Sequence, residues 1–311
     1  MKIIHVSDPH LLALRAVPLR QLLWGKRLLG YANILLRRGH QHDFDVAQAV
    51  LREVGRCKPD HVVVTGDVSN FGLEAELAAA AQWLRNELGL DHDHVSFVPG
   101  NHDAYTRSTH ASRSFSRHFG LSPRGPASAV AGANEAFPYC RKLGPVALIG
   151  LDSAVPQPPL VAAGHVSETQ LQALRRLLDE PGVRDRLPII LVHHPVLYDR
   201  PAAKRWLRGL RNAQDLLAAV SGHPRVVFLH GHLHKWVALQ LRVGVSDVLS
   251  IGAASASQTS RSPDRRAGFN ALDVDASGAI QSLCVHTLDV AAGRFEVRDI
   301  DVLPYRPRGL W

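Results

Sequence analysis

Residues 62–70 read VVVTGDVSN, a β-branched run that ends in glycine, aspartate, serine and asparagine. Three consecutive valines predict a strand that is buried on both faces. Gly66 leaves backbone room for a turn directly after the strand, and Asp67 places a carboxylate at its carboxyl end. Ligands of α/β folds bind at this edge of the sheet, so the stretch predicts both a layered fold and the position of a site.

Runs of the same kind recur along the chain, and helical patterns lie between several of them. The predicted strands are Ile3–Val6, Val62–Thr65, Val95–Val98, Val146–Leu151, Ile189–Val192 and Val226–Leu229. Helices are predicted at Asp45–Cys57, at Leu73–Leu88 and from the N-cap Ser167 to about Asp179. Strands that alternate with helices indicate an α/β fold.

The composition is that of a globular protein. Of 311 residues, 46% are hydrophobic and 21% are charged, which excludes collagen-like, disordered and disulfide-scaffold classes. The net charge of +8 favours anionic partners such as phosphates. Three scattered cysteines favour a reducing compartment, so a cytoplasmic location is expected. No run of 18 or more apolar residues is present, and no transmembrane helix is expected.

Polar clusters follow five of the predicted strands. They are Ser7-Asp8-Pro9-His10, Gly66-Asp67-Val68-Ser69-Asn70, Gly100-Asn101-His102-Asp103, His193-His194-Pro195 and His230-Gly231-His232-Leu233-His234. If the carboxyl ends of these strands meet in one crevice, they bring together seven candidate metal ligands. These are Asp8, His10, Asp67, Asn101, His193, His232 and His234.

The candidate ligands offer imidazole nitrogens and carboxylate or amide oxygens but no thiolate. Such a donor set suits Mn, Fe, Zn, Co or Ni rather than calcium. Seven donors exceed the needs of one tetrahedral ion and suffice for two ions if one carboxylate bridges them. We expect Asp8-Pro9-His10 and His232-Leu233-His234 to be extended, because side chains at i and i+2 of an extended chain point to the same side.

In this order, the five clusters resemble the motifs of the calcineurin-like metallophosphoesterase superfamily. The form of Gly100-Asn101-His102-Asp103 is most similar to the bacterial branch with class III cyclic-nucleotide phosphodiesterases and glycerophosphodiesterases. The resemblance implies a four-layer α/β/β/α sandwich of two mixed sheets flanked by helices. We interpret residues 1–311 as a single domain whose C-terminal part, at about 235–303, forms the second sheet.

The resemblance also implies a role for each motif residue. Asp8, His10 and His234 would hold one metal ion, Asn101, His193 and His232 the other, and Asp67 would bridge the two. His102 would donate a hydrogen bond to a phosphoryl oxygen or to the leaving group, and Asp103 would fix the orientation of His102. A metal-bridging water or hydroxide would attack phosphorus in line.

The sequence therefore predicts a dinuclear metal-dependent phosphohydrolase, with a phosphodiester as the expected substrate class. One alternative is a membrane-surface hydrolase of a lipid-linked phosphate or pyrophosphate. Another is a non-catalytic metal-binding module for nucleic acid or a protein partner, although no nucleic-acid motif supports it. Outside the candidate ligands, we expect His42 to be solvated and Asn70 to cap the helix that begins near Leu73.

An insertion at about 11–43 separates the first cluster from the helix near Asp45. Its residues 11–38 carry an apolar stripe at helical spacing (Trp24, Leu28, Tyr31 and Leu35) with Arg20, Arg27 and Arg38 on a neighbouring flank. This pattern is compatible with a helical cap beside the site or in a homodimer interface. It is also compatible with peripheral contact to an anionic membrane on the inner face.

Overall fold

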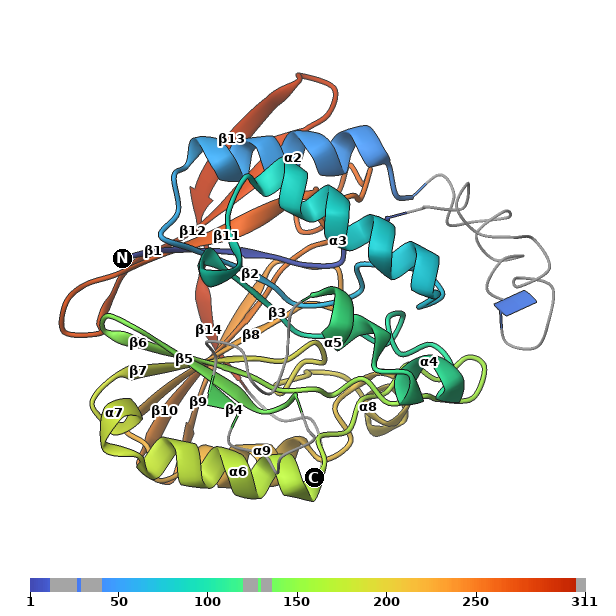
Figure 1. Ribbon diagram of the computed structural model, residues 1–311. Coiled ribbons are helices and arrows are strands. Elements are labelled where there is room, and N and C mark those ends of the chain that lie inside the picture. Colours follow the sequence, from blue (N-terminus) through green and yellow to red (C-terminus); the bar gives the residue numbers. More distant parts are fainter. Residues whose placement is uncertain (12–26, 29–40, 120–127, 130–135, 306–311) are drawn as a thin grey trace.

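The computed structural model describes residues 1–11, 27–28, 41–119, 128–129 and 136–305. They form two mixed sheets that pack face to face, with helices on both outer faces (Figure 1). The four-layer α/β/β/α architecture implied by the sequence is confirmed.

The first sheet has six strands in the order β13-β12-β11-β1-β2-β3. Strands β1, β2 and β3 are parallel, and β11 pairs antiparallel with β1. The bounds are β1 Lys2–Val6, β2 His61–Val64, β3 Val95–Phe97, β11 Gly268–Val274, β12 Ile280–Asp289 and β13 Arg294–Asp299. Helices α2 (Phe44–Arg56) and α3 (Glu74–Leu88) cover its outer face, as Figure 1 shows.

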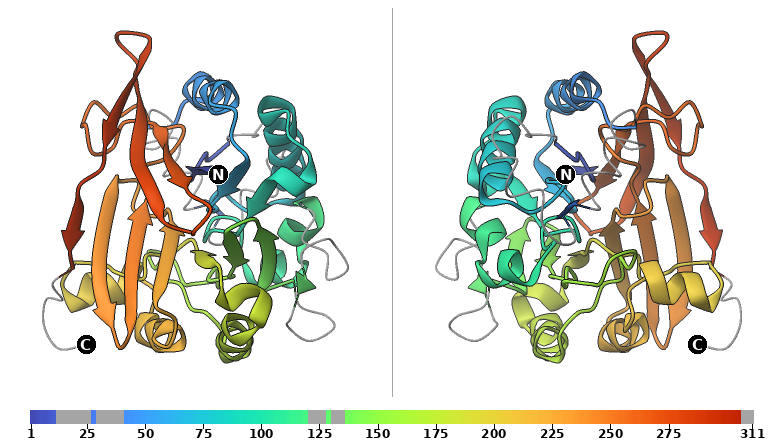
Figure 2. Two further views of the ribbon diagram at one scale, coloured as in Figure 1. Left: turned by 90° about the vertical axis from the view of Figure 1, so that its left-hand side faces the viewer. Right: turned by 90° about the vertical axis from the view of Figure 1, so that its right-hand side faces the viewer.

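The second sheet has eight strands in the order β14-β9-β10-β8-β7-β6-β5-β4. Strands β6, β7, β8 and β10 are parallel neighbours at its centre. The bounds are β4 Ser128–Ala129, β5 Tyr139–Leu143, β6 Val146–Gly150, β7 Leu187–Leu191, β8 Arg225–His230, β9 Val237–Val243, β10 Ser246–Gly252 and β14 Val302–Pro304. Helices α6 (Glu168–Asp179), α7 (Pro181–Arg184) and α9 (Ala213–Val220) lie on its outer face (Figures 1 and 2).

Short elements near the strand ends complete the described chain. They are η4 His92–His94, α4 Arg107–Ala111, α5 Ser114–His118 and α8 Ala202–Arg208.

The main hydrophobic core lies between the sheets. Its cluster joins fully buried residues of the first sheet, such as Ile3 and Val63, to Leu148 and Ile189 of the second. Apolar side chains of α6 and α9 form another core against the far side of the second sheet. Because both faces of β2 and β7 are buried, these strands read as uninterrupted apolar runs in the sequence.

The predicted helix starts have identifiable caps. Asp43 precedes α2, and its Oδ1 accepts hydrogen bonds from the amides of Asp45 (2.8 Å) and Val46 (3.1 Å). Ser167 caps α6 as the sequence predicts, with Oγ 3.3 Å from the Gln170 amide. Before α3, the carboxylate of Glu76 instead reaches back to the amides of Phe71 and Leu73.

The C-terminal strands do not form the second sheet by themselves, so this part of the prediction is wrong. Of the strands within 235–303, β11, β12 and β13 extend the first sheet beside β1, whereas β9 and β10 extend the second sheet beside β8. The physical reason is that β1 and β8 each present an edge with unpaired backbone groups, and the returning chain pairs with both.

The insertion at about 11–43 lies largely outside the described residues. Arg27 and Leu28 are described, and Arg27 donates to the hydroxyl of Thr109 in α4 (3.1 Å). The predicted cap, dimer and membrane roles of this segment therefore stay predictions, as does the single-domain organisation of residues 1–311. Among the described helices, none has the length and apolar character needed to cross a bilayer.

The buried His61 of β2 predicts a loss of stability in acid. Its side chain is 1% exposed, and Nε2 hydrogen-bonds with the Ser96 hydroxyl at 2.9 Å. Burial, reinforced by the charge of Arg141, lowers the pKa of His61 to about 3. Because the unfolded chain binds the proton more tightly, this contribution is intact above about pH 6.5 and falls as the pH drops from there towards 3.

We expect the free energy of unfolding of the wild type to lose about 2 kcal/mol through His61 between pH 7 and pH 5. Urea unfolding of the wild type and of His61→Asn across this pH range measures this loss. The difference between their free energies of unfolding should become smaller in acid. The exposed His92→Asn variant is the control and should keep a constant offset. A constant offset for His61→Asn would contradict the prediction.

Candidate metal centre

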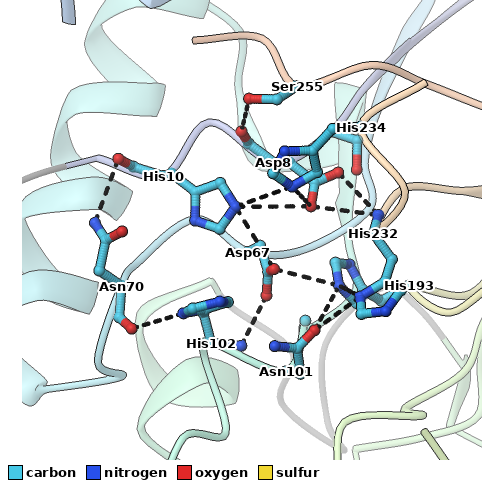
Figure 3. A network of polar contacts seen from close by, with 12 residues as sticks. Asp8, His10, Asp67, Asn70, Asn101, His102, His193, His232, His234 and Ser255 are labelled. Atoms are coloured by element: carbon cyan, nitrogen blue, oxygen red, sulfur yellow. Dashed lines mark hydrogen bonds and ion pairs between the residues drawn. The ribbon is translucent and has the colours of Figure 1, made fainter. Parts of the chain in front are cut away.

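The polar clusters after five strands meet at one edge of the two-sheet sandwich. Strands β1, β2 and β3 of the first sheet lead to Asp8 and His10, to Asp67 and to Asn101, and strands β7 and β8 of the second sheet lead to His193 and to His232 and His234. Figure 3 shows these side chains pointing toward one another. The structure thus brings together all seven predicted ligands from residues up to 226 positions apart.

Four donor atoms form a first group. His234 Nε2 lies 3.3 Å from Asp8 Oδ1 and 3.2 Å from His10 Nε2. His10 Nε2 lies 3.7 Å from Asp67 Oδ2 and 3.9 Å from Asp8 Oδ1. Neighbouring ligands at 2.0–2.1 Å from one ion are about 2.8–3.4 Å from each other in octahedral or tetrahedral geometry. The spacing of the first group is close to that of donors around a single cation.

A second group shares Asp67 with the first. His193 Nε2 lies 3.2 Å from Asn101 Oδ1, 3.3 Å from His232 Nδ1 and 3.4 Å from Asp67 Oδ2. Asn101 Oδ1 is also 2.9 Å from His232 Nδ1. Because Asp67 Oδ2 faces both His10 and His193, it occupies the position of a carboxylate that bridges two ions.

The chemistry of the donors fits divalent cations. Asp8, Asp67, His10 and His193 are at most 2% exposed, so their lone pairs converge where little water reaches. Burial, with neighbouring imidazoles, holds the pKa values of His10 and His232 well below the ordinary value, which keeps both rings in the neutral, ligating form. Burial opposes ionisation of Asp67, but His193, His102 and His10 outweigh it and hold its pKa well below the ordinary value.

The ligand loops are not extended, which corrects the expectation for Asp8-Pro9-His10 and His232-Leu233-His234. The φ angles are +51° and +44° at Asp8 and His10, and +66° and +50° at His232 and His234. Asp67 has φ +52° as well. Left-handed turns, rather than an extended chain, therefore aim the alternate side chains at the centre. Such backbone is costly for residues other than glycine and is concentrated at functional sites.

Two glycines allow the loops to approach each other. A Cβ on Gly231 would collide with Ser7 Oγ and Asp8 Oδ2. Gly66 has φ +85°, and a Cβ there would lie 2.7 Å from the Cα of Gly100. Gly66 thus allows two backbone turns to approach each other, and Gly231 leaves room for the side chains of Ser7 and Asp8.

Hydrogen bonds outside the two donor groups fix the ligand orientations. His193 Nδ1 donates to the carbonyl of Thr65 at 2.7 Å, which leaves Nε2 as the nitrogen facing Asp67 and Asn101. Asp67 Oδ1 accepts from the amide of His102 at 2.8 Å, and Asp8 Oδ2 accepts from the amide of His232 at 3.0 Å.

The structure distinguishes between the adjacent His193 and His194. Both ring nitrogens of His194 are engaged elsewhere: Nε2 donates to the carbonyl of Ala162 at 3.2 Å, and Nδ1 accepts from the Ser153 hydroxyl at 2.8 Å. His193 instead directs Nε2 into the second group. The geometry favours His193 as the ligand, in agreement with the choice made from the sequence.

His102 lies at the edge of the centre, with its ring 5.0 Å from that of His10 between centroids. Asp103 was expected to fix the orientation of His102, but it is the carbonyl of Asn70 that accepts a hydrogen bond from His102 Nδ1, at 2.8 Å. Asp103 instead accepts from the amides of Gly100 and Ser69, both at 2.9 Å. It therefore holds the two ligand-bearing turns together, and the expected role of Asp103 is corrected accordingly.

Three residues near the centre have a function that sequence reasoning missed. Asn70 does not cap a helix, since its Nδ2 donates to the carbonyls of His10 and Leu11 (3.3 and 3.1 Å). Ser255 donates to the carbonyl of Asp8 at 2.6 Å. His42 packs against His10 with ring centroids 4.6 Å apart, contrary to the expectation that it is solvated. The signal for Asn70 was its place directly after a ligand-bearing turn, whereas no local pattern marks Ser255 or His42.

Metal removal and reloading test the centre. Ions that bind only the folded state stabilise it by RT ln(1 + [M]/Kd), about 2.7 kcal/mol per site at a hundredfold excess over Kd. We therefore expect addition of Mn²⁺ to metal-stripped protein to raise the melting temperature by several degrees, measured by scanning fluorimetry. Ca²⁺ at the same concentration should have a smaller effect, because the donors are rich in nitrogen. An equal response to both ions would contradict the assignment.

Comparisons with known proteins identify the family and the fold. The sequence profile of the calcineurin-like phosphoesterase family matches residues 1–236. A dimetal phosphatase from Danio rerio has a similar structure, with a TM-score of 0.57, 16% identity and coverage of 92% of this chain and 95% of the other. A purple acid phosphatase from yellow lupin (Lupinus luteus) seeds gives a TM-score of 0.59 at 10% identity. The alignment covers 98% of this chain and 54% of the lupin chain.

The fold also occurs in a protein described as an anchor. An anchor in the inner membrane complex of Plasmodium has a TM-score of 0.51 and 12% identity, with 97% of this chain and 88% of the other covered. A sequence comparison with curated proteins gives no significant match. At these identities the solved structures show the fold alone, whereas the profile match covers most of the sequence and all five ligand clusters. The chain belongs to the calcineurin-like phosphoesterase family.

Proposed function

We propose that this protein is a dinuclear metal-dependent phosphodiesterase. The observation that carries the proposal is the pair of donor groups joined by Asp67 Oδ2, with His102 fixed beside them. Asp8, His10 and His234 would hold the first ion, Asn101, His193 and His232 the second, and Asp67 both. The nitrogen and oxygen donors suit Mn, Fe, Zn, Co or Ni.

In this proposal the substrate is a phosphate ester and water is the nucleophile. When bound, the two ions lower the pKa of a water molecule and neutralise charge on the phosphoryl oxygens. In-line displacement then forms a bond from the water oxygen to phosphorus and breaks the bond to the ester oxygen. No covalent phosphoenzyme is formed.

His102 acts as the proton donor in this scheme. The Asn70 carbonyl holds the proton on Nδ1, so Nε2 is the ring nitrogen that exchanges a proton with the substrate. Protonated His102 donates from Nε2 to a phosphoryl oxygen or to the departing ester oxygen. Its position, stacked on Tyr105 and edge-on to His10, places it beside the first donor group.

The charge of the site supports a diester rather than a monoester. Within the described part of the chain, no lysine or arginine side chain hydrogen-bonds to any of the seven donor residues. Among the described side chains beside the donor groups, protonated His102 would face the substrate with a positive charge. This limited positive charge suits the single negative charge of a phosphodiester better than the two charges of a phosphomonoester.

The test compares two chromogenic substrates with the same leaving group. Metal-stripped protein reloaded with Mn²⁺ is assayed with bis(4-nitrophenyl) phosphate and with 4-nitrophenyl phosphate. We expect a higher kcat/KM for the diester, and the Asp67→Ala protein, purified in parallel, controls for contaminating phosphatases. A preference for the monoester would replace the proposal with a phosphatase, and failure on both would exclude simple aryl phosphate hydrolysis.

A further inference from the structure

His42 stands beside the first donor group, although it belongs to none of the five strand-end clusters. It lies directly before Asp43, the N-cap of α2, and is partly buried. Its ring is 4.6 Å from that of His10 and 5.5 Å from that of His234, measured between centroids. Each of His42, His10 and His234 has a ring nitrogen that could bind a metal ion, and these three atoms lie within 4.8 Å of one another. Three imidazoles therefore converge on the first group.

Several contacts hold His42 in this position. Its Nδ1 hydrogen-bonds with Ser257 Oγ at 2.8 Å. The backbone on either side is paired with the same loop, since the Asp43 amide donates to the Ser257 carbonyl (2.8 Å) and the Thr259 amide to the Gln41 carbonyl (3.0 Å). A histidine that was merely exposed to solvent would not need a backbone held in place in this way.

The same loop also positions a ligand of the first group. Ser255, two residues before Ser257, donates its hydroxyl to the Asp8 carbonyl at 2.6 Å. The loop after β10 thus fixes His42 and Asp8 relative to each other. Ligation through Nε2 would leave the bond between His42 Nδ1 and Ser257 in place, which is the arrangement found for metal-bound histidines.

The electrostatics of the imidazoles agree with a shared cation. Two imidazoles packed this closely repel each other when both are charged. They are compatible as neutral rings whose lone pairs share one positive ion.

We infer that His42 is an additional ligand of the first metal ion, supplied by the segment that precedes α2. The inference rests on the proposed metal centre. His42 shares a donor group with His10 and His234, while Asp8 and Asp67 form a separate group with the same two histidines. Ligation by His42 would therefore add a third imidazole to the first site, whereas the second offers two imidazoles, an amide and the shared carboxylate. The richer nitrogen content favours Zn, Fe, Co or Ni over Mg or Ca at the first site.

The test is a Co²⁺ titration of metal-stripped protein, followed by visible absorption and by calorimetry. A His193→Ala background weakens the second site, so that the titration reports the first. Loss of an outer-sphere partner of a ligand already costs about 10–100-fold in metal affinity. We expect His42→Gln and His42→Ala to weaken Co²⁺ binding at least about tenfold and to change the d–d absorption bands, which report the number of ligands.

The variants separate ligation from folding. Gln at position 42 keeps a side chain that hydrogen-bonds to Ser257, so circular dichroism and melting of metal-stripped His42→Gln should match those of the parent. His92→Ala, an exposed histidine in η4, should leave affinity and spectrum unchanged. Ser257→Ala removes the hydrogen bond to His42 Nδ1 and a 3.2 Å contact with Ser255 Oγ but leaves the imidazole in place. It should give a smaller loss of affinity than His42→Gln.

Two outcomes would overturn the inference. Unchanged Co²⁺ affinity and spectrum in both His42 variants would exclude ligation. A raised KM for a phosphodiester with unchanged metal binding would show that His42 contacts the substrate instead. The titration needs no turnover. Absence of diester hydrolysis would therefore refute the proposed function and leave the conclusion about His42 ligation unaffected.

Discussion

Asp67→Ala is expected to reduce phosphodiester hydrolysis to the uncatalysed background and to remove at least one metal ion. Asp67 Oδ2 is the donor atom that faces both groups, 3.7 Å from His10 Nε2 and 3.4 Å from His193 Nε2. Replacing Asp67 by alanine removes the one carboxylate that both prospective sites share. Metal content after dialysis, measured by mass spectrometry, and the rate with the chromogenic diester test the prediction together.

The contribution of charge at Asp67 can be separated from that of its hydrogen bond. Asp67→Asn retains an oxygen that accepts from the His102 amide, a contact 2.8 Å long in the wild type. We expect it to fold as the wild type does and still to lose metal affinity. Asp301→Ala, at an exposed carboxylate, is the matched control and should keep both ions. Retention of two ions with unchanged affinity by Asp67→Ala would disprove the bridging role.

His102→Ala is expected to lower kcat by about 10²–10⁴-fold while both metal ions remain bound. The side chain is bound to Asn70 through Nδ1 and belongs to neither donor group. Alanine preserves the backbone amide that donates to Asp67 Oδ1, so the orientation of the bridging carboxylate is maintained. Metal content and kcat, compared with those of the exposed His110→Ala control, test this prediction.

The leaving group identifies where His102 places its proton. If Nε2 protonates the departing oxygen, His102→Ala should slow a diester with an alkyl leaving group far more than one that releases 4-nitrophenolate. If Nε2 instead donates to a phosphoryl oxygen, both substrates should slow equally. Loss of both metal ions from His102→Ala would show that His102 is a ligand and that the role assigned here is wrong.

The sequence predicted the central strands and the ligand clusters because both have local signals. A β-branched run followed by glycine and a polar residue identifies a buried strand and its carboxyl end, as at residues 62–67. The three long helices were predicted within one or two residues, since their caps and apolar spacing are also local. The seven candidate ligands then followed from their common place after strands.

Features that depend on distant pairing were not predictable in this way. Alternation identifies a strand but not its neighbour, so nothing in residues 268–274 shows that β11 pairs with β1 rather than with β9. His42 and Ser255 reach the centre only because the loop after β10 folds back against the start of α2. The left-handed backbone at the ligands was missed because Asp and His adopt both conformations.

The left-handed backbone at the ligands also bears on how this protein could be engineered. Non-glycine residues in this conformation cost of order 1–2 kcal/mol each. Asp8, His10, Asp67, His232 and His234 therefore oppose folding of the metal-stripped chain. A library selected for thermal stability alone should accumulate glycine at these positions and lose its metal centre. Directed evolution of a more heat-resistant variant must therefore select for bound metal in every round, because selection for stability alone favours variants that have lost the metal centre.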